Sequence, residues 1–167
     1  MTGVANRVCV VTGAARGLGQ TIARTLAANG ARVAICDIRG DSLAETAEML
    51  RVSGGDVYAA PCDVSDSAAV DNFFAAVESE FGPIEVLVNN AAIVPGGPED
   101  EVRRDKHYTW LTTPVERDSL GFTAMMSDAE WHKYWAVNVH GLFYCTRAAL
   151  RHMEPRRYGR IVNIASI

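Results

Sequence analysis

The chain has 167 residues, of which 49% are hydrophobic, and its formal net charge is −4. This apolar content is enough for one hydrophobic core, and the net charge does not favour binding to nucleic acid. The N-terminus lacks a signal-peptide pattern and no apolar run is long enough to span a membrane, so we expect a cytoplasmic protein.

The first predicted element is a buried strand that runs into a glycine-rich turn. Residues 8–12 are largely apolar, and Gly13, Gly17 and Gly19 follow before a helical pattern begins. Glycine allows positive φ and close approach of a ligand, while the first N–H groups of a helix have no partner within it. Together with the helix dipole, these donors favour a phosphate at the turn. A P-loop is excluded, because no Gly-Lys-Ser/Thr sequence follows.

A second buried strand is predicted over residues 33–37, and it ends in a carboxylate. Asp37 lies eighteen residues after Gly19, close to the spacing at which an acid meets the adenosine ribose of a dinucleotide. Its charge would repel a 2′-phosphate and therefore favours NAD over NADP, whereas Arg16 and Arg39 could hold that phosphate. The alternative role for Asp37 is a helix cap or a surface acid.

Helical and extended patterns then alternate along the chain. Apolar spacing after the glycine-rich turn predicts a helix that Gly30 ends. Further helices are predicted from polar residues that can cap them. These caps are Asp41 or Ser42, with Glu45 completing a capping box from Ser42, and Ser65 or Asp66.

Strands near residues 57–60 and over 84–90 extend the βαβ pattern into an α/β fold, a doubly wound parallel sheet of the Rossmann type. In such sheets ligands bind outside the carboxyl ends of the strands. Asp63 follows the third strand and could contact adenine or begin a helix. Asn90 ends the fourth strand and could hydrogen-bond a cofactor or pin the neighbouring strands.

The segment 94–126 has no sustained period of either kind and contains several prolines and glycines. Long excursions of this type in compact folds are often functional or mobile. A lid over the site, an insertion and a subunit contact are the three roles that remain open. We treat residues 1–167 as a single dinucleotide-binding domain with this excursion at 94–126.

A capping box of Ser127 and Glu130 predicts a long helix with one mainly apolar stripe, which also includes the amide Asn138. The members of this stripe are Trp131, Tyr134, Trp135, Asn138, Leu142, Cys145 and Ala149. A buried amide needs partners, so Asn138 is either a structural hydrogen-bonding hub or a polar group positioned at a site. A fifth strand over residues 160–165 then brings Ser166 to the sheet edge. Ser166 is interpreted either as a substrate-contacting residue or as the start of a loop.

Cysteine and histidine spacing does not indicate a metal site or disulfides. No two cysteines are close in sequence, and three of the four lie in or beside predicted buried strands, so they are interpreted as small core residues. The histidines also lack the spacing of metal ligands. We therefore expect no metal.

Taken together, these motifs resemble the short-chain dehydrogenase/reductase family. The resemblance implies hydride transfer between a nicotinamide cofactor and an alcohol or ketone. The charge of Asp37 makes NAD, rather than NADP, the expected cofactor. One departure is Ala92, where the family commonly has glycine. The matching motifs are residues 12–19 (Thr-Gly-Ala-Ala-Arg-Gly-Leu-Gly), Asp37, Asp63 with Val64, residues 89–92 (Asn-Asn-Ala-Ala), residues 138–141 (Asn-Val-His-Gly) and residues 161–166 (Ile-Val-Asn-Ile-Ala-Ser).

The resemblance also implies roles for individual residues. Ser166 would hydrogen-bond the substrate oxygen, and Asn138 would hold a water in the proton relay. The residues expected at the cofactor are Gly13, Arg16, Gly17, Leu18, Gly19, Asp37, Ile38, Asp63, Val64, Asn90, Ala91 and Ala92.

The family's Tyr-x-x-x-Lys pair is the part of the pattern that this sequence lacks. None of its five tyrosines has a lysine four residues later. We therefore expect an N-terminal fragment that ends after the fifth strand and is inactive alone. The alternative class is a non-catalytic nucleotide-binding sensor or assembly module. The resemblance further implies a homodimer or homotetramer. Trp110, Phe122 and Met125 indicate that the alcohol or ketone substrate is small and apolar. From the charge and the hydropathy pattern we expect no nucleic-acid or membrane partner.

Overall fold

The structure is a computed structural model that describes residues 3–94 and 96–165. The chain divides into two compact units, one formed by Met1–Ala92 with Ala136–Ile167 and the other by Ile93–Trp135. Each unit is described by itself.

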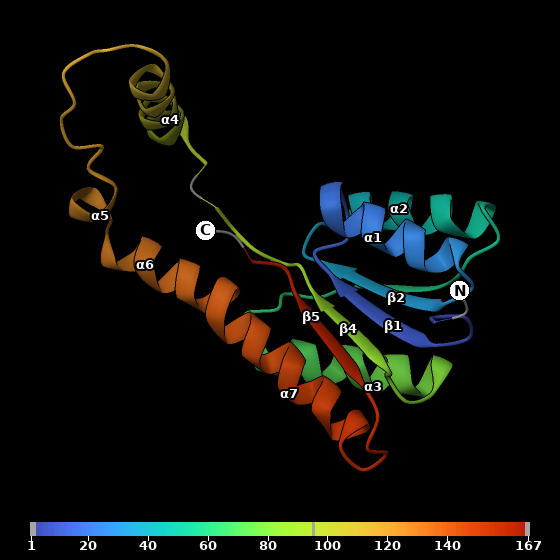
Figure 1. Ribbon diagram of the computed structural model, residues 1–167. Helices are drawn as coiled ribbons and strands as arrows, with labels where there is room; N and C mark the ends of the chain where they lie inside the picture. Colours follow the sequence, from blue (N-terminus) through green and yellow to red (C-terminus); the bar gives the residue numbers. More distant parts are fainter. Residues whose placement is uncertain (1–2, 95, 166–167) are drawn as a thin grey trace. The chain divides into compact units, whose positions relative to one another are not determined.

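The first unit is built on a five-stranded parallel sheet (Figure 1). The order β3-β2-β1-β4-β5 reverses direction beside β1, which creates the switch point at which ligands bind in sheets of this kind. The predicted α/β fold class is confirmed. The strands are β1 (Val8–Thr12), β2 (Arg32–Asp37), β3 (Asp56–Pro61), β4 (Val86–Asn89) and β5 (Arg160–Asn163).

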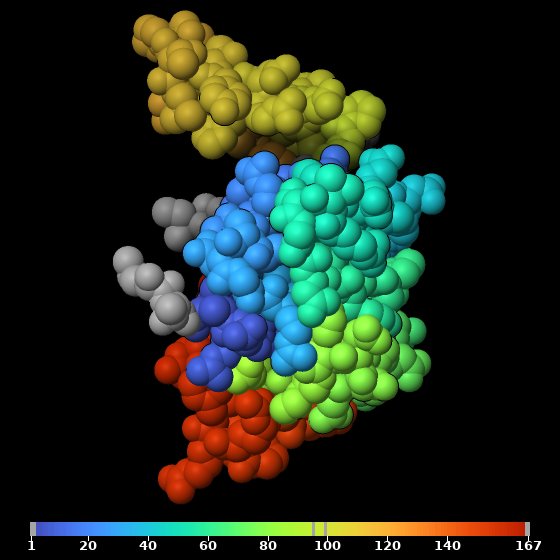
Figure 2. All heavy atoms as spheres, turned by 90° about the vertical axis from the view of Figure 1, so that its right-hand side faces the viewer, coloured from blue at the N-terminus to red at the C-terminus, as the bar shows by residue number. Residues whose placement is uncertain are grey.

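Helices cover both faces of the sheet, which explains why its central strands are nearly continuous apolar runs. On one face lie α1 (Gly17–Ala28) and α2 (Gly40–Val52), and on the other lie α3 (Ser67–Phe81) and α7 (Leu142–Met153). Figure 2 shows the residues of α1 (blue) and α2 (cyan to teal) side by side on the surface of this unit.

The two faces of the sheet carry separate hydrophobic clusters. On the α1 and α2 face, Val11 and Ile35 pack with Leu43 of α2. On the α3 and α7 face, Val10 packs with Phe73 of α3. This alternation follows from the period of two along a strand, which sends successive side chains to opposite faces.

All four cysteines are buried, as expected for core residues. Cys9 belongs to the cluster under α1 and α2, whereas Cys36, Cys62 and Cys145 belong to the cluster under α3 and α7. Burial raises the pKa of the Cys9 and Cys145 thiols to about 12. These two groups are therefore neutral thiols at physiological pH.

The predicted helix caps have different outcomes. Asp66 caps α3, because its carboxylate accepts hydrogen bonds from the backbone N–H of Ala68 at 2.8 Å and of Ala69 at 3.3 Å. The expected capping box from Ser42 in α2 is wrong. This helix begins at Gly40, with Arg39 at the N-cap position and no side-chain cap among the described residues.

The second unit contains α4 (Pro98–Thr112), α5 (Phe122–Met125) and α6 (Asp128–Trp135). The helix α4 was not predicted, because its sequence has no apolar periodicity. It is a largely polar helix with a proline in its first turn, which is a favourable place for proline. An ion pair of 3.0 Å between Arg103 and Asp100 lies within this helix. The predicted box at α6 is confirmed: Ser127 N–H donates to Glu130 at 2.9 Å, and Glu130 N–H donates to Ser127 Oγ at 3.2 Å.

The predicted long helix after Ser127 is divided by a π-helical turn, η1 (Ala136–Gly141), between α6 and α7. A π-turn shifts the register of the side chains that follow it. The predicted stripe is wrong over its first half, where Trp131 and Trp135 in α6 are 50% and 41% exposed and Asn138 within the π-helical turn is exposed too. Its second half is buried at Cys145 and Ala149.

Among the described residues, no helix has the length and apolar character needed to cross a bilayer. The expected cytoplasmic location stays a prediction.

Candidate functional site

The candidate site lies at the carboxyl edge of the sheet, where the first four strands end at Thr12, Asp37, Pro61 and Asn89. Because all strands are parallel, the loops that follow them emerge at this same edge. All described residues of the expected cofactor site belong to the first unit.

Each glycine of the turn after β1 is required for a different reason. Gly13 has φ +65°, and a Cβ there would lie 2.7 Å from Ala91 Cα. Gly19 has no room for a Cβ because it packs on the carbonyl oxygen of Gly13. Gly17 has φ +60°, but a Cβ there would meet no described atom within 4 Å. Gly13 and Gly19 are therefore required by close packing in the turn, whereas Gly17 is required by its positive φ and has open space beside it.

The N-terminus of α1 provides backbone donors at this open space. Arg16 is the N-cap residue, and no described side chain caps the helix or places an acid in its first turn. The first N–H groups of an α-helix have no acceptor within the helix, and the dipole places partial positive charge at this end. The geometry therefore fits a phosphate or diphosphate group.

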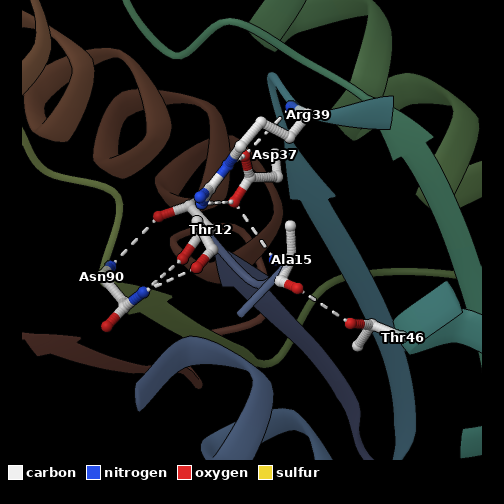
Figure 3. Close-up of polar contacts among 7 residues, drawn as sticks. Thr12, Ala15, Asp37, Arg39, Thr46 and Asn90 are labelled. Atoms are coloured by element: carbon white, nitrogen blue, oxygen red, sulfur yellow. Dashed lines mark hydrogen bonds and ion pairs between the residues drawn. The ribbon is translucent and has the colours of Figure 1, made fainter. Parts of the chain in front are cut away.

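Asn90 joins the glycine-rich turn to the end of β4 (Figure 3). Its Nδ2 group donates to the carbonyl oxygens of Thr12 and Gly13, each at 3.0 Å. In return, Thr12 Oγ1 accepts from the backbone N–H of Asn90 at 3.1 Å and of Ala91 at 3.0 Å. Asn90 thus pins the neighbouring strands, which was one of its two predicted roles. A cofactor contact by Asn90 stays a prediction.

Asp37 is buried, with 5% of the residue exposed. One carboxylate oxygen accepts from the Ala15 N–H at 3.1 Å and from Arg39 Nη2 at 3.1 Å. The other accepts from the Arg39 backbone N–H at 3.0 Å and from Arg39 Nε at 3.1 Å. Figure 3 shows the guanidinium lying against the carboxylate. Asp37 is neither a helix cap nor a surface acid, because it ties β2 to the glycine-rich turn.

The electrostatics of Asp37 follow from these contacts. Burial alone would raise the pKa of its carboxyl group. The hydrogen bonds from the Arg39 side chain and from the backbone N–H groups of Arg39 and Ala15 outweigh burial, so the pKa lies below its ordinary value. The same ion pair raises the pKa of Arg39.

Two threonines support the turn in roles that were not predicted, although Thr12 belongs to the motif over residues 12–19. Thr12 accepts the two N–H groups described above, and Thr46 of α2 donates to the Ala15 carbonyl at 3.0 Å. Gln20 of α1 in turn donates to Thr46 Oγ1 at 2.8 Å. A signal was present for both threonines: Thr12 is the polar end of a buried strand, and Thr46 lies among the buried apolar residues of α2.

The remaining expected cofactor residues differ in exposure. Asp63 is exposed, and its Oδ1 accepts from the Ser65 N–H at 2.9 Å and from Ser65 Oγ at 2.7 Å. It forms a turn ahead of α3, whose cap is Asp66 instead. Val64 is buried, whereas Leu18 and Ile38 are 56% and 67% exposed. These two exposed side chains follow the glycine-rich turn and Asp37, so each could present an apolar surface to a ligand there.

The expected catalytic residues are less defined. Asn138 lies in the π-helical turn, a type of irregularity that often occurs at functional sites. Ser166 lies outside the described residues. At the end of β4, Asn89 Nδ2 donates to Thr146 Oγ1 at 3.0 Å and to Asn163 Oδ1 at 2.9 Å, which connects β4 to α7 and β5. The roles of Asn138 and Ser166 stay predictions.

Comparison with known proteins identifies this arrangement. A family model described as short chain dehydrogenase matches residues 7–167. The 2,3-dihydro-2,3-dihydroxybenzoate dehydrogenase of Bacillus subtilis is 34% identical over 164 residues, which cover 98% of this chain and 54% of that protein. The 2-(R)-hydroxypropyl-CoM dehydrogenase of Xanthobacter autotrophicus is 40% identical over 163 residues, which cover 97% of this chain and 57% of that protein.

Solved structures agree with the sequence comparisons. A crystal structure of an actinorhodin polyketide ketoreductase variant with NADPH superposes with a TM-score of 0.78 at 33% identity, covering 99% of this chain and 54% of that one. The chain spans about half the length of the relatives that it matches. Both the matched residues 7–167 and the identity over nearly the whole chain lead to one conclusion: the chain belongs to the short-chain dehydrogenase family.

Proposed function

We propose that the chain is the cofactor-binding part of an NAD(H)-dependent oxidoreductase that transfers hydride between a nicotinamide and an alcohol or ketone. The observation that carries this proposal is the N-terminus of α1, which lacks a side-chain cap among the described residues and lies behind the open space at Gly17. Such an end binds a diphosphate with both hydrogen-bond donors and a favourable field. Membership of an oxidoreductase family supports the same function.

Different residues of the first unit would bind different parts of the cofactor. The turn over residues 13–19 would hold the diphosphate, Asp37 the adenosine ribose, and Asp63 with Val64 the adenine. Ala91 and Ala92 follow β4 and would border the cofactor beyond the diphosphate. The bound nicotinamide would accept or donate the hydride.

Proton transfer would depend on other side chains. Ser166 would hydrogen-bond the substrate oxygen, and Asn138 would hold a water in the proton path. The sequence contains no tyrosine with a lysine four residues later. We therefore expect the 167-residue chain to bind a dinucleotide without turning over an alcohol or ketone.

We propose NAD(H) rather than NADP(H) as the cofactor, because the Asp37 carboxylate would repel a 2′-phosphate. Two observations favour NADP(H) instead: the solved structure of a relative contains NADPH, and Arg39 lies beside Asp37. Assembly as a homodimer or homotetramer, a small apolar substrate and a single domain over residues 1–167 complete the proposal. The oligomeric state rests on membership of the family, the apolar substrate on Trp110, Phe122 and Met125, and the single domain on the even composition of the chain.

The test places a negative charge at the N-terminus of α1, the feature on which the proposal rests. Leu18 is exposed in the first turn of α1, so Leu18→Asp adds a carboxylate beside the proposed diphosphate and Leu18→Asn is the matched neutral control. Because the new carboxylate and the diphosphate are both negative, Leu18→Asp should bind NADH about tenfold or more weakly than Leu18→Asn. The thermal unfolding temperature of Leu18→Asp should not be lower than that of the unmodified chain, because an acid in the first turn of a helix is favourable.

Fluorescence titration with NADH measures the affinities. Binding by the unmodified chain and by Leu18→Asn, with a large loss in Leu18→Asp, is the expected result. Failure of the unmodified chain to bind NADH, or equal binding by the two Leu18 variants, would contradict the proposal.

A further inference from the structure

We propose that Thr46, a buried residue of α2, is a positioning residue for the dinucleotide. Its hydroxyl group fixes the orientation of the peptide group that joins Ala15 to Arg16 in the glycine-rich turn. Thr46 acts through this peptide group rather than by contact with the cofactor. The inference rests on the proposed function, because it concerns how the turn over residues 13–19 is shaped for the diphosphate.

The hydroxyl of Thr46 lies in a short polar chain within an apolar layer. Thr46 is 1% exposed, and its neighbours Leu43 and Ala47 belong to the hydrophobic cluster under α1 and α2. Its Oγ1 donates to the Ala15 carbonyl at 3.0 Å and accepts from Gln20 Nε2 at 2.8 Å. A buried hydroxyl is costly unless it is hydrogen-bonded, so both contacts hold it in one direction. The chain of donors runs from Gln20 through Thr46 to Ala15.

Both backbone polar groups of Ala15 are held by the surrounding structure. Its N–H donates to the Asp37 carboxylate at 3.1 Å, and its carbonyl accepts from Thr46. The preceding N–H, of Ala14, donates to the Cys36 carbonyl at 3.1 Å. The first part of the turn is thus tied to β2, and only the Thr46 hydroxyl ties its Ala15 carbonyl to α2.

The orientation of the Ala15 carbonyl decides where the next N–H points. In a planar trans peptide group the carbonyl and the N–H point in opposite directions. Because the Ala15 carbonyl points to Thr46, the Arg16 N–H points away from α2. Arg16 is the N-cap residue of α1, and its N–H has no acceptor among the residues that the structure describes. Free donors at a helix N-terminus are the groups that bind phosphate.

Loss of the Thr46 hydroxyl would permit the opposite orientation of this peptide group. The Ala15 carbonyl would be left buried without its side-chain donor, a state that favours rotation of the peptide toward solvent. Rotation would place the carbonyl oxygen, with its partial negative charge, where the Arg16 N–H had been. The diphosphate would then meet a repulsive group in place of a donor.

The test compares Thr46→Val with Thr46→Ser. Valine keeps the shape of threonine without the hydroxyl, whereas serine keeps the hydroxyl and loses the methyl group. In fluorescence titrations with NADH, Thr46→Val should bind about tenfold more weakly than the unmodified chain, and Thr46→Ser should bind within about twofold of it. Thr25→Val is the matched control, because the Thr25 hydroxyl donates to the Thr21 carbonyl on the exposed surface of α1. It should leave the affinity unchanged.

Urea unfolding separates positioning from packing. Thr46→Ser removes a buried methyl group, so it should unfold at a lower urea concentration than the unmodified chain while it keeps the affinity for NADH. If Thr46→Val does not fold, Gln20→Met tests the same chain of donors at a half-buried position. Without the Gln20 donor, the Thr46 hydroxyl is free to bond within its own helix. We expect Gln20→Met to bind NADH about two- to threefold more weakly.

The outcomes distinguish this inference from the proposed function. An unmodified chain that does not bind NADH would overturn the proposed function itself. Suppose instead that the unmodified chain binds NADH. Equal affinities of Thr46→Val and the unmodified chain, or an equal loss of affinity in Thr46→Ser and Thr46→Val, would overturn the positioning role of Thr46 and leave the proposed function in place. An unchanged affinity in Gln20→Met would do the same if Thr46→Val does not fold.

Discussion

The two ends of the parallel sheet each contain a buried carboxylate, but the partners of these carboxylates differ. At the carboxyl end, Asp37 pairs with Arg39, two residues further along the same loop. At the amino end, Glu85 accepts from Arg7 Nη1 at 2.6 Å, Arg156 Nη2 at 3.2 Å and the Val8 N–H at 3.3 Å. These partners are 71 to 78 residues away in sequence.

Sequence separation changes what each ion pair can do. Glu85 connects the start of β1, the approach to β4 and the segment after α7, so its bonds hold together parts of the chain that are remote in sequence. Closing a long loop constrains the chain more than closing a short one. The Arg39 side chain closes only a two-residue loop, so releasing it need not open the fold. We infer that Glu85 serves stability and that Asp37 is free to serve binding.

The largest effect should follow from Glu85→Gln. This change removes the charge that three donors share, and it should lower the free energy of unfolding by about 2 kcal/mol. Urea unfolding at pH 7 measures the loss, and NADH titration should give the affinity of the unmodified chain. If Glu85→Gln changed the NADH affinity without lowering the free energy of unfolding, Glu85 would serve binding rather than stability, contrary to the comparison above.

A smaller loss of stability should follow from Asp37→Asn, because its partner Arg39 is half exposed and the amide retains one acceptor. We expect about 1 kcal/mol in the same unfolding experiment. NADH binding should weaken clearly, since asparagine accepts fewer hydrogen bonds than a carboxylate. If Asp37→Asn unfolded as readily as Glu85→Gln and bound NADH normally, Asp37 would be structural as well.

The smallest effect is the dependence of stability on pH. Burial tends to raise the pKa of both carboxyl groups, but hydrogen bonds from their arginine and backbone partners hold both below the ordinary values. Each group therefore stabilises the fold above its unfolded pKa, near pH 4, and this contribution is lost as the pH falls through the lower folded pKa. The gap between the unmodified chain and either variant should be constant from pH 7 to about 5 and should narrow below about pH 4. A gap that stayed constant to about pH 3 would contradict the two lowered pKa values.

Strands, glycines and two of the three helix caps could be predicted because their signals are local, whereas the box from Ser42 failed because α2 begins at Gly40. The fully buried strand β1 is an apolar run, and the caps at Asp66 and Ser127 depend on atoms within three residues. The helix α4 was missed because its polar surface does not need an apolar stripe. The exposure of Asn138 was missed because sequence spacing assumes 3.6 residues per turn, which a π-turn violates.

Contacts between segments that are distant in sequence could not be predicted from the sequence pattern. Asp37 and the glycine-rich turn were recognised as neighbours, but the bonds from Arg39 that fill the carboxylate depend on the course of the chain between β2 and α2. The pairing of Glu85 with Arg7 and Arg156 was not predicted either, because these residues meet only after the sheet and α7 have formed.

The buried cysteines make the two faces of the sheet separately observable. A thiol shielded from solvent reacts with an alkylating reagent only when the surrounding structure opens. Cys9 would report the release of α1 and α2, whereas Cys36, Cys62 and Cys145 would report the release of α3 and α7. Mass spectrometry of alkylated peptides could therefore time the opening of each layer with no introduced probe.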